Sequence, residues 1–349
     1  MTGTRTSRPL REGETPSTAE RVRALARPGI YPRPPERVEV RETHMSWVFL
    51  AGDHVYKLKK PVKTPVLDFS TLQAREVNAL REVRLNRRLA PGVYYGVVPL
   101  TQERAGRLAL DGGGRVIDWL VHMRRLPETA MLDHLIENGA VPRDRIDALG
   151  HRLAAFYRRA ARADISPTAY AARFGRELEE SREVLLHSPV SLDSGTAPVL
   201  DRAEAALRHI RPLLEERVRG GHVVDGHGDL RPEHVCLLDP PVVIDCLEFN
   251  RELRLVDPFD ELAFLGFECT RLGAPWVRGR LIELCAQALG GRPPEPLIAF
   301  YTAFRGLVRA RLALAHLLEP DPATPEKWRP RALEYVRIAA EATPLPPEG

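Results

Sequence analysis

Short apolar runs, separated by glycine and proline turns, dominate the first third of the chain. The runs at 38–50, 55–60, 93–100, 107–110 and 116–123 are rich in β-branched and aromatic residues, which favours strands. Residues 71–90 instead carry apolar side chains at helical spacing. The positions expected to face a core are Leu72, Val77, Leu80, Val83 and Leu89. The order strand, strand, helix and three further strands predicts a small mixed sheet-and-helix lobe.

Helical spacing dominates the rest of the chain. The predicted helices cover 130–138, 143–163, 169–186, 197–216, 258–271, 276–289, 294–318 and 329–342. Residues 224–245 interrupt them with a loop and a short apolar strand. The change of pattern near 124–127 predicts an α+β, bilobal protein. Its expected parts are a disordered tail at 1–16, an N-terminal lobe at 17–125, a helical C-terminal lobe at 126–342 and a tail at 343–349.

Composition narrows the function classes. The net charge is only +4, and the arginines lie among acidic residues, so no nucleic-acid surface is expected. No run of about eighteen apolar residues is present, so no membrane span is expected. The polar N-terminus lacks the apolar segment of a secretory signal, and we therefore expect a cytoplasmic protein. The four cysteines form no CxxC pair and are expected to be buried thiols.

Two aspartates in the interrupting segment carry the strongest chemical signal. Asp229 follows Gly228, which lets the chain turn sharply, and Asp245 ends the apolar run at 242–244. A proton acceptor and a carboxylate ligand for Mg²⁺ at such positions are what phosphoryl transfer requires. The alternatives are a loop cap for Asp229 and a structural salt bridge for Asp245. Glu248 could be a second metal ligand, a substrate contact or a surface residue.

Lysine is rare in this chain, and four of its five lysines lie within 57–63. Lys57 is expected to reach a nucleotide phosphate and a helix glutamate, Glu82 or alternatively Glu76, with Lys59 as the second choice. The alternative is a solvated strand end with extended lysine stems. Ser46 could offer its hydroxyl and amide to a phosphate. The chain has no G-x4-GK-[ST] sequence, which disfavours a Walker-type ATPase.

Charged residues on the C-terminal helices are interpreted more simply. Asp257 is expected to cap the helix at 258–271, and Asp260 could bond backbone amides of the loop that holds Asp229. Arg305, Arg309 and Arg311 are interpreted as a solvated helix face.

These residues together resemble a known family. The HGDL sequence at 227–230, the aspartate at 245, VYKLKKP at 55–61 and DPFDELA at 257–263 are similar to aminoglycoside phosphotransferase-like kinases, which have a protein-kinase-like fold. THMSWVFL at 43–50, LDFSTL at 67–72, LNRRLAP at 85–91 and DCLEFN at 245–250 resemble an uncharacterised bacterial group within it. In that group the domain is often fused to a P-loop ATPase-like domain, which implies a P-loop ATPase-like partner protein here.

The resemblance implies roles for particular residues. Lys57 would bind the α- and β-phosphates of ATP, Asp229 would be the catalytic base and Asp245 a Mg²⁺ ligand. The segment at 122–126, with Met123 and Arg124, would be the hinge beside adenine.

The loop that contains Asp229 departs from the family pattern at one position. His234 stands where a metal-binding Asn is usual, so it is the candidate second metal ligand, although imidazole suits Mg²⁺ less well than an amide oxygen. Arg231 would supply charge to the γ-phosphate.

We therefore expect an O-phosphotransferase that uses ATP and Mg²⁺ on a small hydroxylated molecule. His234 motivates the alternative of a nucleotide-binding pseudokinase with a regulatory or scaffolding role. A protein kinase is less favoured, because the helical insert at 169–216 argues against an open peptide groove.

Overall fold

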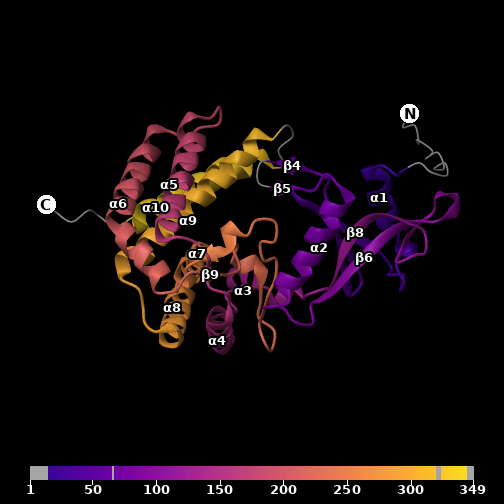
Figure 1. Ribbon diagram of the computed structural model, residues 1–349, viewed down its shortest axis with the longest axis horizontal. Helices are drawn as coiled ribbons and strands as arrows, with labels where there is room; N and C mark the ends of the chain where they lie inside the picture. Colours follow the sequence, from indigo (N-terminus) through magenta and orange to yellow (C-terminus); the bar gives the residue numbers. More distant parts are fainter. Residues whose placement is uncertain (1–14, 65–66, 320–323, 344–349) are drawn as a thin grey trace. The chain divides into compact units, whose positions relative to one another are not determined.

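The computed structural model describes residues 15–64, 67–319 and 324–343. The chain forms two compact units, Met1–Pro127 with Val242–Arg251, and Glu128–Pro241 with Glu252–Gly349 (Figure 1). The predicted division between 125 and 126 lies two residues from the observed one. However, the segment Val242–Arg251, which was assigned to the C-terminal lobe, belongs to the first unit. Asp245 is therefore a residue of the first unit. The predicted tails at 1–16 and 343–349 lie mostly outside the described residues.

The first unit is built on an antiparallel six-stranded sheet with the order β1-β2-β3-β8-β6-β7. Its strands are β1 (Val38–Glu42), β2 (Ser46–Ala51), β3 (His54–Lys59), β6 (Tyr94–Gln102), β7 (Leu108–Leu110) and β8 (Arg115–Arg124). A short pair, β4 (Lys63–Thr64) and β5 (Leu67–Asp68), leads to helix α2 (Leu72–Asn86). The helix and the three strands predicted to follow it are present. The predicted strand at 38–50 is instead two antiparallel strands, β1 and β2, so three strands of the sheet and the short β4–β5 pair precede α2.

The register assigns side chains to the two faces of this sheet. Ser46 lies opposite Lys59, and Lys57 lies opposite Val121, so these side chains share one face. The other face carries Tyr56, Leu58 and Leu120, which form a core with Leu25 of α1 (Thr18–Leu25) and Tyr31 after η1 (Pro28–Ile30). The chemically active side chains are thus separated from the apolar core by the sheet.

Helix α2 does not bury the face that its apolar spacing predicts. Leu72, Val77 and Leu80 are exposed, and the prediction that they face the core is wrong. Among the expected inner positions, Val83 and Leu89 are buried. The buried face is instead partly polar, with Arg75, Asn78, Glu82 and Asn86. Arg75 pairs with the buried Asp118 at 2.7 Å, so the helix is fixed by charge pairs that an apolar count cannot detect.

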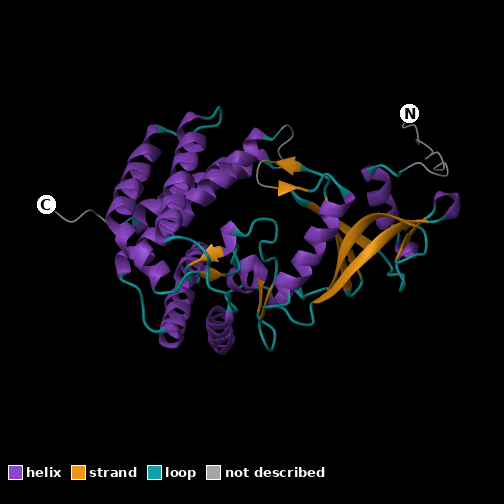
Figure 2. Cartoon of the chain, in the orientation of Figure 1, coloured by secondary structure: helices purple, strands orange, loops and turns teal. Residues whose placement is uncertain are grey.

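The second unit is mainly helical (Figure 2). Its helices are α3 (Leu132–Glu137), α4 (Arg143–Arg159), α5 (Pro167–Arg182), α6 (Ala197–Arg219), α7 (Pro258–Leu272), α8 (Trp276–Leu289), α9 (Glu295–Ala315) and α10 (Pro325–Ala342). Helix α7 is buried over most of its length. All eight helices predicted from spacing are present, with bounds that shift by a few residues.

Short strands and helical turns connect the larger elements of both units. Strands β9 (Val224–Asp225) and β12 (Leu255–Val256) pair with each other, and β10 (Val235–Cys236) and β11 (Val242–Val243) lie along the chain between them. The short helical turns are η2 (Arg104–Gly106), η3 (Glu128–Ala130), η4 (Glu183–His187), η5 (Ser194–Thr196), η6 (Pro232–His234), η7 (Glu252–Arg254) and η8 (His316–Leu318). The four cysteines are free and buried, as predicted.

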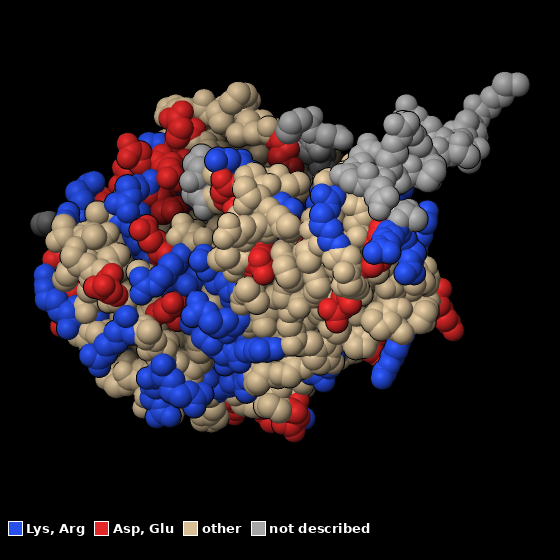
Figure 3. Space-filling view, turned by 45° about the vertical axis from the view of Figure 1, so that its right-hand side comes forward, with Lys and Arg blue, Asp and Glu red and all other residues tan. Residues whose placement is uncertain are grey.

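Among the described residues, no helix has both the length and the apolar character needed to cross a membrane. On the face drawn in Figure 3, basic side chains gather toward the lower left, with acidic side chains among and around them.

Candidate active site

A buried network of charges lies on the Lys57 face of the first unit. Lys57 Nζ lies 3.1 Å from Glu82 Oε1 and 2.7 Å from Asp245 Oδ1. Burial opposes the charge of Lys57, but Asp245 and Glu82 outweigh it and raise the pKa of Lys57 well above its ordinary value. The predicted pairing of Lys57 with Glu82 is therefore present, and Glu76 is not the partner. Asp245 joins the same network although it lies 188 positions further along the chain.

Lys59 is a structural centre of this network. It is 1% exposed, and its ammonium pairs with both Glu82 and Glu248. Its Nζ also lies 5.6 Å from the centre of the Phe69 ring. The interpretation of the basic cluster as a solvated strand end is therefore wrong for Lys59. Glu248, whose role the sequence left open, serves to hold this lysine.

The backbone of the 242–251 segment is fixed next to α2. Asp245 has a positive φ of 60°, a conformation that aspartate tolerates better than most residues. Its backbone N–H donates to Tyr94 Oη at 3.2 Å, and Cys246 N–H donates to Asn86 Oδ1 at 2.9 Å. The Asp245 side chain remains 44% exposed. A constrained backbone thus presents an accessible carboxylate beside a lysine, which suits a cation bound together with phosphates.

The other predicted nucleotide contacts differ in how well they fit. Ser46 is fully buried, and its Oγ has no hydrogen-bond partner among the described residues, which is unusual for a buried hydroxyl. Met123 lies opposite Val55 on the Lys57 face, where it could contact an adenine ring. Arg124 fits less well, because its backbone N–H donates to Val93 O at 2.8 Å and its side chain is exposed.

In the second unit, Glu261 of α7 holds the backbone that precedes Asp229. Its Oε1 accepts hydrogen bonds from His227 N at 2.9 Å and from Gly228 N, and its Oε2 accepts from Tyr157 Oη at 2.8 Å. Burial raises the pKa of the Glu261 carboxyl. The expectation that Asp260 bonds these amides is wrong, because the neighbouring residue does so. The acidic residues at the start of α7 were the signal, but spacing alone could not choose between them.

Two glycines allow this close approach. Gly228 has a φ of 90°, which residues with a Cβ rarely adopt. A Cβ at Gly226 would lie 2.4 Å from Val256 Cγ2 and 2.9 Å from Glu261 Oε2.

Gly226→Ala is therefore expected to destabilise the second unit by about 2 kcal/mol through overpacking. Urea unfolding of the variant and the wild type measures this difference. Gly279→Ala in α8 is the control for the added methyl group: a Cβ there would meet nothing within 4 Å, so this variant should be as stable as the wild type or up to about 1 kcal/mol more stable. An unchanged midpoint in Gly226→Ala would contradict the close packing of this loop.

Asp229 lies in a short loop with Arg231 and His234. Arg231 Nε lies 3.0 Å from Asp229 Oδ1, and the same guanidinium pairs with Glu233 Oε1 at 2.5 Å. Burial opposes ionisation of Asp229, but Arg231 and, more weakly, Arg309 hold the pKa of its carboxyl below the ordinary value. Asp229 is thus ionised at neutral pH and 29% exposed. It can accept a proton, and the alternative role of a loop cap does not account for its charge partners.

Both ring nitrogens of His234 contact other residues of the same loop. Its Nδ1 lies 2.8 Å from the Asp229 carbonyl oxygen and its Nε2 lies 3.2 Å from Arg231 Nη2. A carbonyl only accepts and a guanidinium only donates, so Nδ1 carries the proton and Nε2 accepts. Both nitrogens of a neutral ring are thereby engaged, which argues against the predicted role of His234 as a metal ligand. Over the residues that the structure describes, no group of three or more His, Cys, Asp or Glu side chains could hold a metal ion.

The arginines of α9 are not a solvated face. Arg305 makes a bidentate pair, at 2.7 Å and 2.7 Å, with the fully buried Asp260. Arg309 lies 3.2 Å from Glu268 Oε1, and Arg311 pairs with Glu177 at 2.5 Å. The sequence interpretation of these three side chains is therefore wrong, and Arg309 is a charged neighbour of Asp229 that the sequence did not reveal.

Asp257 has the expected capping role. Its Oδ1 accepts from Phe259 N at 3.0 Å at the start of α7. Its carboxylate also pairs with Arg217 at 2.6 Å.

Comparison with known proteins adds independent information about the fold. No family model matches the chain. Uncharacterized proteins of Mycobacterium tuberculosis and Mycobacterium bovis are 33% identical over 291 residues, which cover 82% of this chain and 56% of each relative. The chain therefore spans about half the length of the curated relatives it matches.

Solved structures of small-molecule kinases have the same fold. A choline/ethanolamine kinase family protein from Mesorhizobium loti is 15% identical, with a TM-score of 0.55 over 93% of this chain and 95% of that chain. A choline kinase from Cryptosporidium parvum is 12% identical, with a TM-score of 0.51 over 92% of this chain and 94% of that chain. The predicted α+β, protein-kinase-like fold is confirmed: the chain has the fold of the choline and ethanolamine kinases.

Proposed function

We propose that this chain is an O-phosphotransferase that uses ATP and Mg²⁺ and acts on a small hydroxylated molecule. The observation that carries the proposal is Lys57, whose ammonium lies between Glu82 and the accessible carboxylate of Asp245. A partly buried lysine held by a glutamate, beside a carboxylate at a fixed backbone position, is the arrangement that phosphoryl transfer from a nucleotide requires.

Each residue of the first unit would have a distinct task. Glu82 holds Lys57 in place, so the ammonium can exchange the Asp245 carboxylate for a phosphate oxygen without moving far. Asp245 is then available as a ligand for Mg²⁺. The Ser46 hydroxyl, which lies on the same face, would donate to a phosphate oxygen. Bound ATP would supply the phosphoryl group, and the Mg²⁺ bound with it would neutralise part of the phosphate charge.

In the second unit, Asp229 would orient the acceptor hydroxyl and take its proton. Its lowered pKa keeps it ionised, and the hydrogen bonds of Glu261 fix the backbone that presents it. Arg231 would share its charge between Asp229 and the incoming phosphate, a role that requires its present pair with Glu233 to loosen. Arg309 adds positive potential near the same carboxylate.

The fold alone does not decide the acceptor, since one fold serves many substrates. Amino alcohols head the candidates, because the neighbours with the same fold are named choline and ethanolamine kinases. Amino sugars and other polyols follow.

Purified chain is expected to convert ATP and one member of a panel of amino alcohols, amino sugars and polyols to ADP and a phosphomonoester. Mass spectrometry of the products identifies the acceptor. The same panel without Mg²⁺, and with Lys57→Ala, should give no product above background. If the wild-type chain binds no ATP by calorimetry in the presence of Mg²⁺, the proposal is wrong.

A nucleotide-binding pseudokinase is the second candidate, favoured by one observation. His234 occupies the position where a second metal ligand is expected, and both of its nitrogens are engaged within the loop. This candidate requires ATP binding without turnover for every acceptor. Mg²⁺-dependent turnover that is lost in Asp229→Asn excludes it.

A further inference from the structure

A hollow of about 390 Å³ lies beside α2 in the first unit. Its walls include the aromatic rings of Phe69 and Phe249 and the side chain of Val77. Volumes of this size are typical of small-molecule sites. Three polar residues of α2, Gln73, Asn78 and Arg81, also line this hollow.

Asn78 is the unusual member of the lining. It is 4% exposed, and its Oδ1 has no hydrogen-bond partner among the described residues. Buried amide oxygens are almost always paired, because an unmet acceptor loses its hydration without compensation. A bound group with an N–H or O–H donor would satisfy this oxygen.

Arg81 supplies a second recognition element. It lies one turn from Val77 and Asn78, is only partly exposed, and makes no ion pair with a described residue. The acidic side chain of the same lining, Asp68, is already committed to Lys63 at 2.8 Å and to Ser70. The charge of Arg81 is therefore available to an anionic group at the rim.

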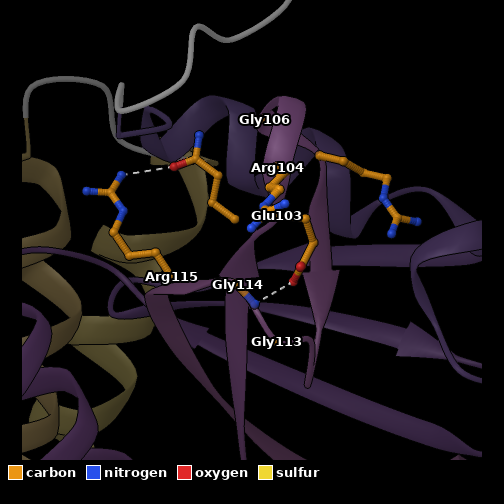
Figure 4. A pocket seen from close by; sticks show the side chains of 8 residues that line it. Glu103, Arg104, Gly106, Gly113, Gly114 and Arg115 are labelled. Atoms are coloured by element: carbon orange, nitrogen blue, oxygen red, sulfur yellow. Dashed lines mark hydrogen bonds between the residues drawn. The ribbon is translucent and has the colours of Figure 1, made fainter.

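The larger hollow of this unit lacks these features. It lies at the tip of β6, β7 and β8, where Glu103 accepts from Gly114 N and Arg115 donates to Gln102 (Figure 4). Its other arginines, Arg104 and Arg107, are exposed. Open arginines on a turn do not make a built site, whereas a buried amide oxygen without a partner points to a ligand.

We propose that the hollow beside α2 binds a small aromatic carboxylate that carries a ring N–H donor. The ring would stack among Phe69, Phe249 and Val77, the N–H would donate to Asn78 Oδ1, and the carboxylate would pair with Arg81. This site is separate from the phosphotransferase function proposed above and does not depend on it.

The position of the site gives such a ligand contact with two elements of the charge network. Asn78 lies one helical turn before Glu82 on α2, and Phe249 directly follows Glu248. Both glutamates pair with Lys59, so a ligand in the hollow contacts the helix and the segment that these pairs join.

Indole-3-acetate is the probe that tests this site. By ligand-detected NMR or calorimetry, the wild-type chain is expected to bind it with a Kd of about 1 mM, as ligand efficiency predicts for its size. Indole, which lacks the carboxylate, should bind about fivefold more weakly. Arg81→Gln should weaken indole-3-acetate about fivefold and leave indole unchanged. Arg84→Gln, an exposed residue on the same helix outside the lining, is the matched control and should change neither.

Asn78→Leu provides the second test, because it removes the acceptor and keeps the size of the side chain. It should weaken both probes, and circular dichroism confirms that the variant is folded. Binding that is absent in the wild type, or that is equal in wild type, Arg81→Gln and Asn78→Leu, overturns the proposal. Retained ATP binding in every variant would separate this result from a failure of the phosphotransferase site.

Discussion

Asp229→Asn is expected to lower kcat by about 10³-fold and to leave the affinity for ATP nearly unchanged. The amide keeps the shape of the carboxylate but cannot take the proton of the acceptor hydroxyl. A positioned general base typically accelerates the chemical step by a factor of this order. The low pKa of Asp229 gives a further expectation. Because this pKa lies below the ordinary value of about 3.9, Asp229 is ionised throughout the neutral range. Protonation of Asp229 should therefore not lower kcat at neutral pH. Steady-state kinetics and ATP calorimetry measure the two effects.

Glu233→Gln is the matched control for this prediction. It removes a carboxylate from the same loop and from the same arginine, but not the proposed base. Its kcat should stay within about threefold of the wild type, since an exposed ion pair contributes little. Equal losses in Asp229→Asn and Glu233→Gln would show that the loop needs charge balance rather than a base.

The order of secondary structure could be predicted because local rules decide it. β-Branched and aromatic runs gave the strands, and spacing gave all eight helices of the second unit. The orientation of α2 could not be predicted in this way. Leu72, Val77 and Leu80 satisfy helical spacing but are exposed, and the buried face of that helix instead carries the ion-paired side chains of Arg75 and Glu82.

The candidate site, too, could be predicted from the sequence only in part. Lys57, Glu82 and Asp245 were identified because a lysine on an apolar strand and a carboxylate after a buried strand both need partners. The sequence alone could not decide which of the adjacent acids on α7 contacts the loop of Asp229. Asp260 and Glu261 are both fully buried, but Asp260 pairs with Arg305, whereas Glu261 accepts from the backbone of the loop. Such choices depend on tertiary contacts.

Glu82→Gln is expected to destabilise the first unit by about 3 kcal/mol. Glu82 is fully buried and lies between Lys57 and Lys59, so its loss leaves the buried ammonium of Lys59 and the partly buried ammonium of Lys57 with one carboxylate fewer. Burial and Asp245 act against ionisation of Glu82, but the two lysines lower its pKa. Its contribution is therefore complete above the unfolded-state pKa of about 4.3 and is lost as the pH falls through the lower folded-state value. The stability difference between wild type and variant should shrink in acid.

Glu76→Gln separates this effect from a general loss of negative charge on α2. Glu76 lies on the same helix and was the alternative predicted partner of Lys57, but in the structure Lys57 pairs with Glu82. Its substitution should change the free energy of unfolding by less than about 0.5 kcal/mol. Calorimetric unfolding of wild type and both variants at neutral and acidic pH measures these values. Equal stability of Glu76→Gln and Glu82→Gln at neutral pH would mean that Lys57 and Lys59 do not depend on Glu82, and the fixed position of Lys57 would then need another cause.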